Sequence, residues 1–234
     1  MPLILCLETS SKNCSVSIYN NDSIVGSKEF IDEGYCHGEK LHVLINDLLI
    51  ESGFSIKDFD VFCFSSGPGS YTGLRIGAAS VKGFSFALDK PIVAIPTLKS
   101  LAWGVANNQL LNKINKLDIL CPIIDSRQGE VYAALYDSNL KICLDPFSCN
   151  IMTFSFLEYL EQGKVYFFGT GLYKLSPLIK HKNAIFIDDI IPSSKYLGIL
   201  ANKDFNKKKF VDPAYFEPLY LKEFIPTVSK KMNT

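Results

Sequence analysis

The order of apolar and polar positions divides the first half of the chain into alternating strands and helices. Apolar or alternating runs predict strands over residues 3–7, 14–19, 24–30, 61–64 and 92–95. Apolar residues three and four positions apart predict a helix over 37–51, which ends at Gly53. Further helices are predicted over 72–88 and 98–110. Three strands followed by alternating helices and strands indicate an α/β fold with a partly parallel sheet.

The second half of the chain has a weaker pattern. It predicts strands over 117–124, 130–136, 165–168 and 184–187 and short helices over 154–161 and 193–202. Residues 213–226 contain three prolines and are expected to be irregular. Polar, asparagine-rich sequence near 105–118 interrupts the pattern. We therefore predict an N-terminal unit over 1–110 and a smaller C-terminal unit over 111–234.

Composition restricts the classes of function. Hydrophobic residues make up 47% of the 234 residues, which is enough for a sizeable core. Lys plus Arg and Asp plus Glu balance at 24 each, whereas a protein that grips nucleic acid alone usually has a basic excess. Seven cysteines without a CxxC pair favour a reducing compartment. No signal peptide or membrane-spanning run is seen, so we expect a cytoplasmic protein.

The sequence SSGPGSYTGLRIG, residues 65–77, joins a predicted strand to a predicted helix and resembles a phosphate-binding turn. It lacks the lysine of a Walker A loop, because position 74 is Leu, and the third glycine of a dinucleotide fingerprint, because position 72 is Thr. Gly67 and Gly69 still permit a close approach of backbone, and either Ser70 or Thr72 can cap the helix. Amides at the helix start can face an anion, so both a phosphate site and a packing role stay open.

The helix that follows has small residues on one stripe. Gly73, Gly77 and Ser80 recur at i, i+4 and i+7, and Gly83 follows three positions further on. Glycine costs a helix about 1 kcal/mol relative to alanine, so three glycines in one helix are not expected to serve local stability. Small residues allow another segment to approach closely. That segment can belong to the same chain or to a partner.

Other candidates for chemistry are weaker. Glu8 follows the first strand, at a position where ligands gather in α/β sheets, although a role in the turn is an equal alternative. His37 and His42 are five residues apart and do not share a helix face, so the spacing of a helical zinc site is absent. Asp125 to Tyr132 form either a polar site or a hairpin with a local ion pair. No credible pair of nucleophile and base is present.

These motifs together resemble the bacterial TsaB family, also called YeaZ. The resemblance is carried by SSGPGSYTGLRIGAASVKGFSFAL, ILCLETSSKNCSVSIY and HGEKLHVLINDLL, and by the later segments IPTLKSLA, IDSRQGEVYAALY and PLYLK. It covers most of the chain and is strongest over residues 3–136. It implies the actin/Hsp70/hexokinase-like (ASKHA) fold, an α/β fold of two related lobes with mixed sheets and covering helices.

The resemblance also implies a function. TsaB is a non-catalytic subunit of the machinery that forms N6-threonylcarbamoyladenosine (t6A) at position 37 of tRNA. It docks on the catalytic relative TsaD, supports the ATPase TsaE and can self-associate through the same helices, so tRNA is expected only through the complex. The segment that corresponds to the metal-binding histidines of TsaD, residues 97–103, contains no histidine. We therefore expect no catalytic residue, no metal and no membrane contact.

The site residues follow from this resemblance. The helices 37–51 and 72–88 are expected to form the docking surface, with partner contacts from Leu41, Leu44, Ile45, Leu48, Gly73, Gly77 and Ser80. The candidate nucleotide or phosphate residues are Glu8, Gly67, Gly69 and Ser70, with no tightly bound cofactor and ATP or ADP considered only at the complex interface. Most family members have Asp where this chain has Glu8, which argues against independent hydrolysis.

Two other functions compete with the assembly subunit. One is a stand-alone ASKHA-type small-molecule kinase or ATPase that uses Glu8 and the turn 67–73. The other is a protease, which the lack of a nucleophile–base pair or metal cluster in the sequence disfavours.

Overall fold

A computed structural model gives the structure of the chain and describes residues 2–31, 36–107, 114–127, 129–150 and 155–222. The strands of the first sheet have the spatial order β3-β2-β1-β4-β5. They are β1 (Leu3–Glu8), β2 (Asn13–Asn20), β3 (Ser23–Ile31), β4 (Val61–Ser65) and β5 (Ile92–Ile95). β1, β4 and β5 run parallel, while β2 and β3 add an antiparallel hairpin. All five strands and the partly parallel sheet confirm the prediction.

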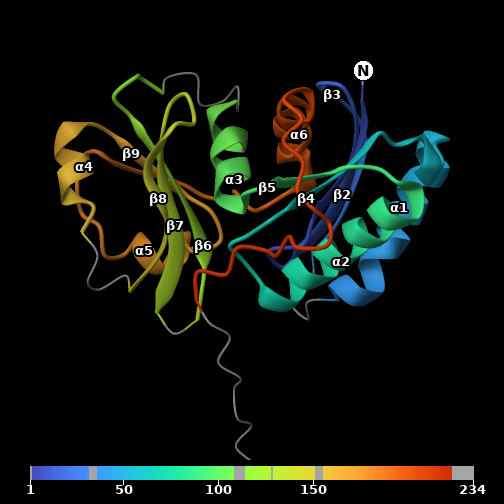
Figure 1. Ribbon diagram of the computed structural model, residues 1–234. Helices are drawn as coiled ribbons and strands as arrows, with labels where there is room; N and C mark the ends of the chain where they lie inside the picture. Colours follow the sequence, from blue (N-terminus) through green and yellow to red (C-terminus); the bar gives the residue numbers. More distant parts are fainter. Residues whose placement is uncertain (1, 32–35, 108–113, 128, 151–154, 223–234) are drawn as a thin grey trace, which may run out of the picture.

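Two helices cover one face of this sheet (Figure 1). α1 (His37–Ser52) and α2 (Tyr71–Leu88) lie side by side, and Gly53 ends α1 in the left-handed conformation. Side chains alternate along β1, so Leu5 and Leu7 pack on the side of α1 and α2 while Cys6 packs on the other side. A strand covered on both faces is apolar throughout, as the sequence of β1 is.

The second sheet repeats the connectivity of the first. Its order is β10-β9-β6-β7-β8, where β6 is Ile119–Asp125, β7 is Glu130–Asp137, β8 is Ile142–Asn150, β9 is Val165–Phe168 and β10 is Ala184–Ile187. In each sheet the first three strands along the chain form an antiparallel meander. The fourth strand then pairs parallel to the first, and the fifth pairs parallel to the fourth. α4 (Leu157–Gln162) and α5 (Leu172–Leu175) pack on one face of this sheet. The chain therefore consists of two related lobes.

Two helices lie between the sheets (Figure 1). α3 (Thr97–Ala106) packs on the second sheet through Leu98 and Leu101, while α6 (Gly198–Asn206) packs on the first sheet through Leu200 and Ala201. The end of the chain thus completes the packing of the first sheet. The predicted boundary between residues 110 and 111 lies outside the described residues, so the division into 1–110 and 111–234 stays a prediction.

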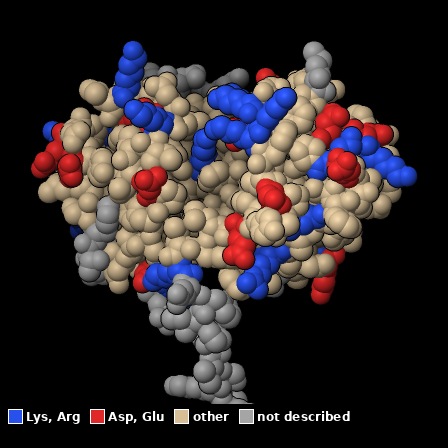
Figure 2. All heavy atoms as spheres, viewed as in Figure 1, with Lys and Arg blue, Asp and Glu red and all other residues tan. Residues whose placement is uncertain are grey.

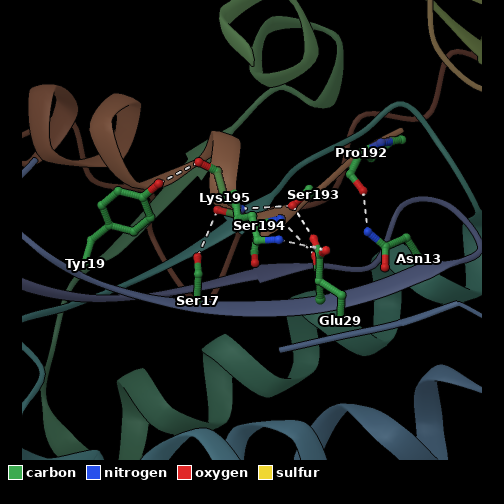
Figure 3. A network of polar contacts seen from close by, with 9 residues as sticks. Asn13, Ser17, Tyr19, Glu29, Pro192, Ser193, Ser194 and Lys195 are labelled. Carbon is green, nitrogen blue, oxygen red and sulfur yellow. Dashed lines mark hydrogen bonds and ion pairs between the residues drawn. The ribbon is translucent and has the colours of Figure 1, made fainter. Parts of the chain in front are cut away.

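The segment 192–195, just before α6, is held across β2 and β3 by a polar network (Figure 3). Asn13 donates from Nδ2 to the carbonyl of Pro192 at 2.9 Å, and the Tyr19 hydroxyl donates to the carbonyl of Lys195 at 2.6 Å. Glu29 accepts hydrogen bonds from the Ser193 hydroxyl and the Lys195 ammonium. These bonds join residues more than 160 positions apart and fix α6 to the first lobe.

The C-terminal tail, residues 211–222, is irregular, as the prolines predicted, yet it is packed. Val211 forms a bridge with Ile92, and the ring of Phe216 packs edge-on against Phe64 with centroids 5.4 Å apart. Further along, the Leu219 amide donates to the carbonyl of Ser66 at 2.7 Å. The tail therefore runs back to the turn that precedes α2.

Several boundaries and elements differ from the sequence prediction. β8 was not predicted, and neither were α5 and the short 3-10 helix η1 (Ile56–Asp58). The helix predicted over 98–110 ends at Ala106, and residues 108–113 lie outside the described residues. The helix predicted over 193–202 is a 3-10 turn, η3 (Ser194–Tyr196), followed by α6. No helix of the described ranges combines the length and the apolar character needed to cross a membrane.

Candidate functional site

The glycine-rich turn lies between β4 and α2 and is filled by the chain itself. Gly67 has φ +101°, and a Cβ atom there would lie 2.8 Å from the carbonyl oxygen of Leu219 in the tail. A Cβ atom on Gly69 would lie 2.4 Å from the carbonyl oxygen of Ser10. The close approach that glycine permits is therefore used by protein backbone.

Backbone amides at the start of α2 find hydrogen-bond acceptors within the chain. The Ser70 amide donates to the carbonyl of Ser10 at 2.7 Å, and the Ser70 hydroxyl accepts from the Gly73 amide at 3.2 Å, which confirms Ser70 as the helix cap. The Leu219 backbone covers Gly67 from the other side. These residues do not fit a phosphate group in the conformation described, so the geometry supports packing at this turn.

Glu8 lies next to this turn, at the end of β1, and is fully buried. Its Oε1 accepts hydrogen bonds from the Ser10 amide at 2.7 Å and the Ser65 hydroxyl at 2.6 Å. Oε2 has no hydrogen-bond partner among the described residues. Burial raises the pKa of the carboxyl, and the hydrogen bonds from Ser65 and Ser10 offset part of that rise. Within the described ranges no three His, Cys, Asp or Glu residues are grouped to hold a metal ion.

The stripe of small residues on α2 packs against the chain itself, and its assignment to a partner interface stays a prediction. A Cβ atom on Gly73 would lie 2.0 Å from the carbonyl oxygen of Thr9, and one on Gly77 would lie 2.5 Å from Thr9 Oγ1. Ser80 is buried; its hydroxyl donates to the carbonyl of Ile76 at 2.9 Å and lies 3.2 Å from Nε2 of His42. The stripe lets α2 approach the turn after β1 and the neighbouring α1.

The leucine stripe of α1 also faces inward. Leu41, Ile45 and Leu48 are buried in the core between α1 and the first sheet, and Leu44 is half-buried against the same core. The contribution of these four side chains to a partner interface stays a prediction. In sequence, an inward stripe and a docking stripe have the same spacing, so the pattern did not separate them.

The outward faces of α1 and α2 expose a different set of apolar side chains. On α1, Val43 and Ile50 are 51% and 72% exposed and lie seven residues apart on one face. On α2, Phe86 is 93% exposed. Three residues earlier, a Cβ atom added to Gly83 would have no neighbouring atom within 4 Å. Phe86 has the highest exposed fraction among the exposed large apolar side chains of the described residues. We call Val43, Ile50, Gly83 and Phe86 the outer face.

The polar hairpin between β6 and β7 forms ion pairs with lysines from distant parts of the chain. Asp125 lies 2.5 Å from Nζ of Lys174, and Glu130 pairs with Lys222 of the tail. Gln128 lies outside the described residues. The hairpin therefore links α5 and the tail to the second sheet.

Comparisons with known proteins agree with the two-lobed fold. The model of the family described as "TsaD: tRNA N6-adenosine threonylcarbamoyltransferase" matches residues 34–223. The chain is similar to the Escherichia coli (strain K12) protein named "tRNA threonylcarbamoyladenosine biosynthesis protein TsaB", with 26% identity over 94% of each chain. It is also similar to the Bacillus subtilis (strain 168) protein of the same name, with 27% identity over 85% of this chain and 80% of that protein.

A solved structure has the same fold. The structure of "YeaZ from Pseudomonas aeruginosa" superposes with a TM-score of 0.79 at 24% identity and covers 94% of this chain and all of that chain. Two related lobes with mixed sheets and covering helices, as described above, make this an α/β fold of the ASKHA class.

Proposed function

Because the chain belongs to the TsaB (YeaZ) family, we propose that it takes part in the biosynthesis of t6A in tRNA. In this role it is a non-catalytic subunit that docks on TsaD and supports TsaE. The names of the curated relatives support the pathway. The observation that carries the docking role is the outer face, where Phe86 is 93% exposed on a helix that is otherwise packed on one side.

The outer face suits a helical partner. Gly83 leaves a flat area beside Phe86, and Ala79 and Ala87 on the same helix are also exposed. Small residues flanking a large aromatic allow a second helix to approach closely and to bury the ring. A homodimer through the same face competes with TsaD, because both would cover Phe86.

The region around Glu8 supports a role without catalysis. The carboxyl is buried, its Oε1 is used by Ser10 and Ser65, and the neighbouring turn is filled by Ser10 and Leu219. Because the turn is filled, any ATP or ADP is proposed to bind at the junction with TsaD and not in the turn. ATP hydrolysis by the purified chain that is lost in Glu8→Ala would instead favour the stand-alone kinase or ATPase.

The test combines binding with product formation. Purified TsaD is titrated with the wild-type chain, with Phe86→Glu and with Leu157→Glu, a control on α4 where the leucine is 51% exposed. We expect Phe86→Glu to weaken binding at least tenfold and the control to bind as the wild type does. Equal binding of all three would remove the outer face from the proposal.

The pathway itself is tested by reconstitution. A tRNA transcript is incubated with TsaD, TsaE and the enzyme that makes the threonylcarbamoyl adenylate, with and without this chain, and t6A is measured by mass spectrometry of the nucleosides. We expect t6A only when this chain is present, and none from this chain alone. Product formation that does not depend on the chain would overturn the proposal.

A further inference from the structure

The end of α6 carries a concentration of positive charge on a chain whose total charge is zero. Lys203, Lys207, Lys208 and Lys209 are all exposed within seven residues, with Asp204 as the one acid among them. Figure 2 shows Lys and Arg side chains gathered over α6, between the two lobes. Among the residues that the structure describes, none of the four lysines makes an ion pair.

α6 ends among these lysines. The Lys208 amide donates to the carbonyl of Phe205, and the Lys209 amide donates to the carbonyl of Asp204, so the helix ends in a Schellman motif. Lys208 has φ +54°, a conformation that glycine usually provides. Lys203 and Lys207 are four residues apart and repel each other on one face. A favourable interaction with the helix dipole explains cations in the last turn, but it does not explain Lys208 or Lys209 beyond it.

A cavity opens beside the lysines. It has a volume of about 460 Å³ and is lined by Asp60, Pro91, Phe205, Asn206, Lys208 and Phe210. The rings of Phe205 and Phe210 meet edge to face with centroids 5.7 Å apart, and Phe210 is 41% exposed. The cavity thus offers aromatic surface, an amide and a carboxylate next to an ammonium group.

This combination matches the way proteins bind single-stranded nucleic acid. Ammonium groups contact phosphates, while exposed aromatic rings stack on bases whose edges bond to amides and carboxylates. We propose that the end of α6 and its cavity bind a single-stranded segment of RNA, with the lysines on the phosphates and an unstacked base against Phe210. This proposal departs from the sequence expectation that tRNA is met only through the complex. The choice of RNA rests on the proposed function in tRNA modification.

The position of this surface leaves it open during docking. α6 packs on the face of the first sheet opposite α1 and α2. The cavity also lies where β4 and β5 begin, at Asp60 and Pro91, whereas the glycine-rich turn lies where β4 ends. A partner on the outer face and an RNA strand at α6 can therefore be bound together.

The experiment measures binding of the full chain to a fluorescein-labelled tRNA transcript by anisotropy between 50 and 200 mM KCl. The test variant replaces Lys203, Lys207, Lys208 and Lys209 with Gln. The matched control replaces four exposed lysines elsewhere, namely Lys57, Lys141, Lys180 and Lys182. We expect the test variant to bind at least tenfold more weakly and the slope of log affinity against log salt to fall by about 3. The control should lose less than threefold.

A second variant tests whether an RNA base stacks on Phe210. Phe210→Ala should weaken binding of a single-stranded RNA oligonucleotide fivefold or more and leave binding of a duplex of the same length unchanged. Absence of binding by the wild type at 50 mM KCl, wild-type affinity in the lysine variant, or an equal loss in the control would overturn the proposal. If the lysine variant binds tRNA normally while t6A formation still needs the chain, the surface fails and the proposed function stands. If the lysines bind tRNA but t6A forms without the chain, the RNA-binding surface stands and the proposed function fails.

Discussion

The hydroxyl of Ser65 donates a 2.6 Å hydrogen bond to Oε1 of Glu8 and so joins the ends of β4 and β1 at the centre of the first lobe. The bond lies in a fully buried environment, where the charged form of a carboxyl is disfavoured. Burial accordingly raises the pKa of Glu8 above its ordinary value of 4.5.

This raised pKa predicts how stability changes with pH. Between 4.5 and the folded-state pKa the folded chain binds more protons at Glu8 than the unfolded chain, so the contribution of Glu8 to stability falls as pH rises through that window. Glu8→Gln keeps the acceptor but does not titrate. We expect the free energy of unfolding of the variant minus that of the wild type to grow from pH 4 to pH 8, as measured by urea denaturation.

Taking a difference removes other titrations. Burial alone would raise the pKa of Glu29, but the hydrogen bonds from Ser193 and Lys195 outweigh burial and lower it. The contribution of Glu29 to stability therefore changes with pH in the direction opposite to that of Glu8. It is the same in the wild type and in Glu8→Gln, so it cancels in the difference. A difference between Glu8→Gln and the wild type that stays constant over this range would contradict a raised pKa at Glu8.

Two glycines on α2 should respond to alanine with opposite signs. Gly83→Ala adds a methyl group in open space and removes the helix cost of glycine, so we expect a gain of about 1 kcal/mol. Gly73→Ala forces a methyl group against the carbonyl of Thr9 and should cost about 1 to 3 kcal/mol. Chemical denaturation of both variants decides this, and a stabilising Gly73→Ala would show that the approach to Thr9 is not tight. Gly77 also contacts Thr9, so a large residue there would disturb the fold as well as any docking.

The tail should contribute to the stability of the first lobe. Phe216→Ala removes a half-buried ring that packs on Phe64, and we expect a loss of about 2 kcal/mol, below the 3 to 5 of a fully buried phenylalanine. The adjacent Tyr215, 85% exposed, is the control, and its replacement by alanine should change stability by less than about 0.5 kcal/mol. Equal effects of the two changes in thermal unfolding would mean that the tail is not anchored by Phe216.

The polar network at residues 192–195 gives a prediction about a single hydrogen bond. Asn13→Ala leaves the carbonyl of Pro192 without its donor in a buried setting, which should cost about 1 to 3 kcal/mol. Asn139, exposed in the turn after β7, serves as a matched asparagine whose replacement should be nearly neutral. A neutral Asn13→Ala in urea denaturation would mean that water replaces the bond.

The sequence predicted those features of the fold that depend only on residues close together along the chain. The strands of the first sheet, the left-handed Gly53 and the cap by Ser70 all follow from local rules, and they are confirmed. β8 was missed because Pro146 and Asp145 interrupt its apolar pattern, which an edge strand tolerates.

The candidate site was harder to predict because its geometry depends on distant segments. Nothing near Gly67 indicates that Leu219, more than 150 residues later, fills the turn. On α2 both the inward Gly73 and the outward Gly83 are glycines, and only the fold shows which of them meets protein and which meets solvent. A spacing rule identifies a stripe but not the side of the helix that the sheet occupies.

The packing of α6 on the first sheet has a consequence for synthesis on the ribosome. All five strands of that sheet are complete once residue 95 has been made, but most of the cover over the face that carries Cys6 and Cys63 comes from residues after 191, with Trp103 of α3 also packed there. For the synthesis of about one hundred further residues this apolar face lacks α6. The nascent first lobe is therefore a natural client for chaperones that bind exposed apolar strands, and premature termination before α6 yields a product prone to aggregation.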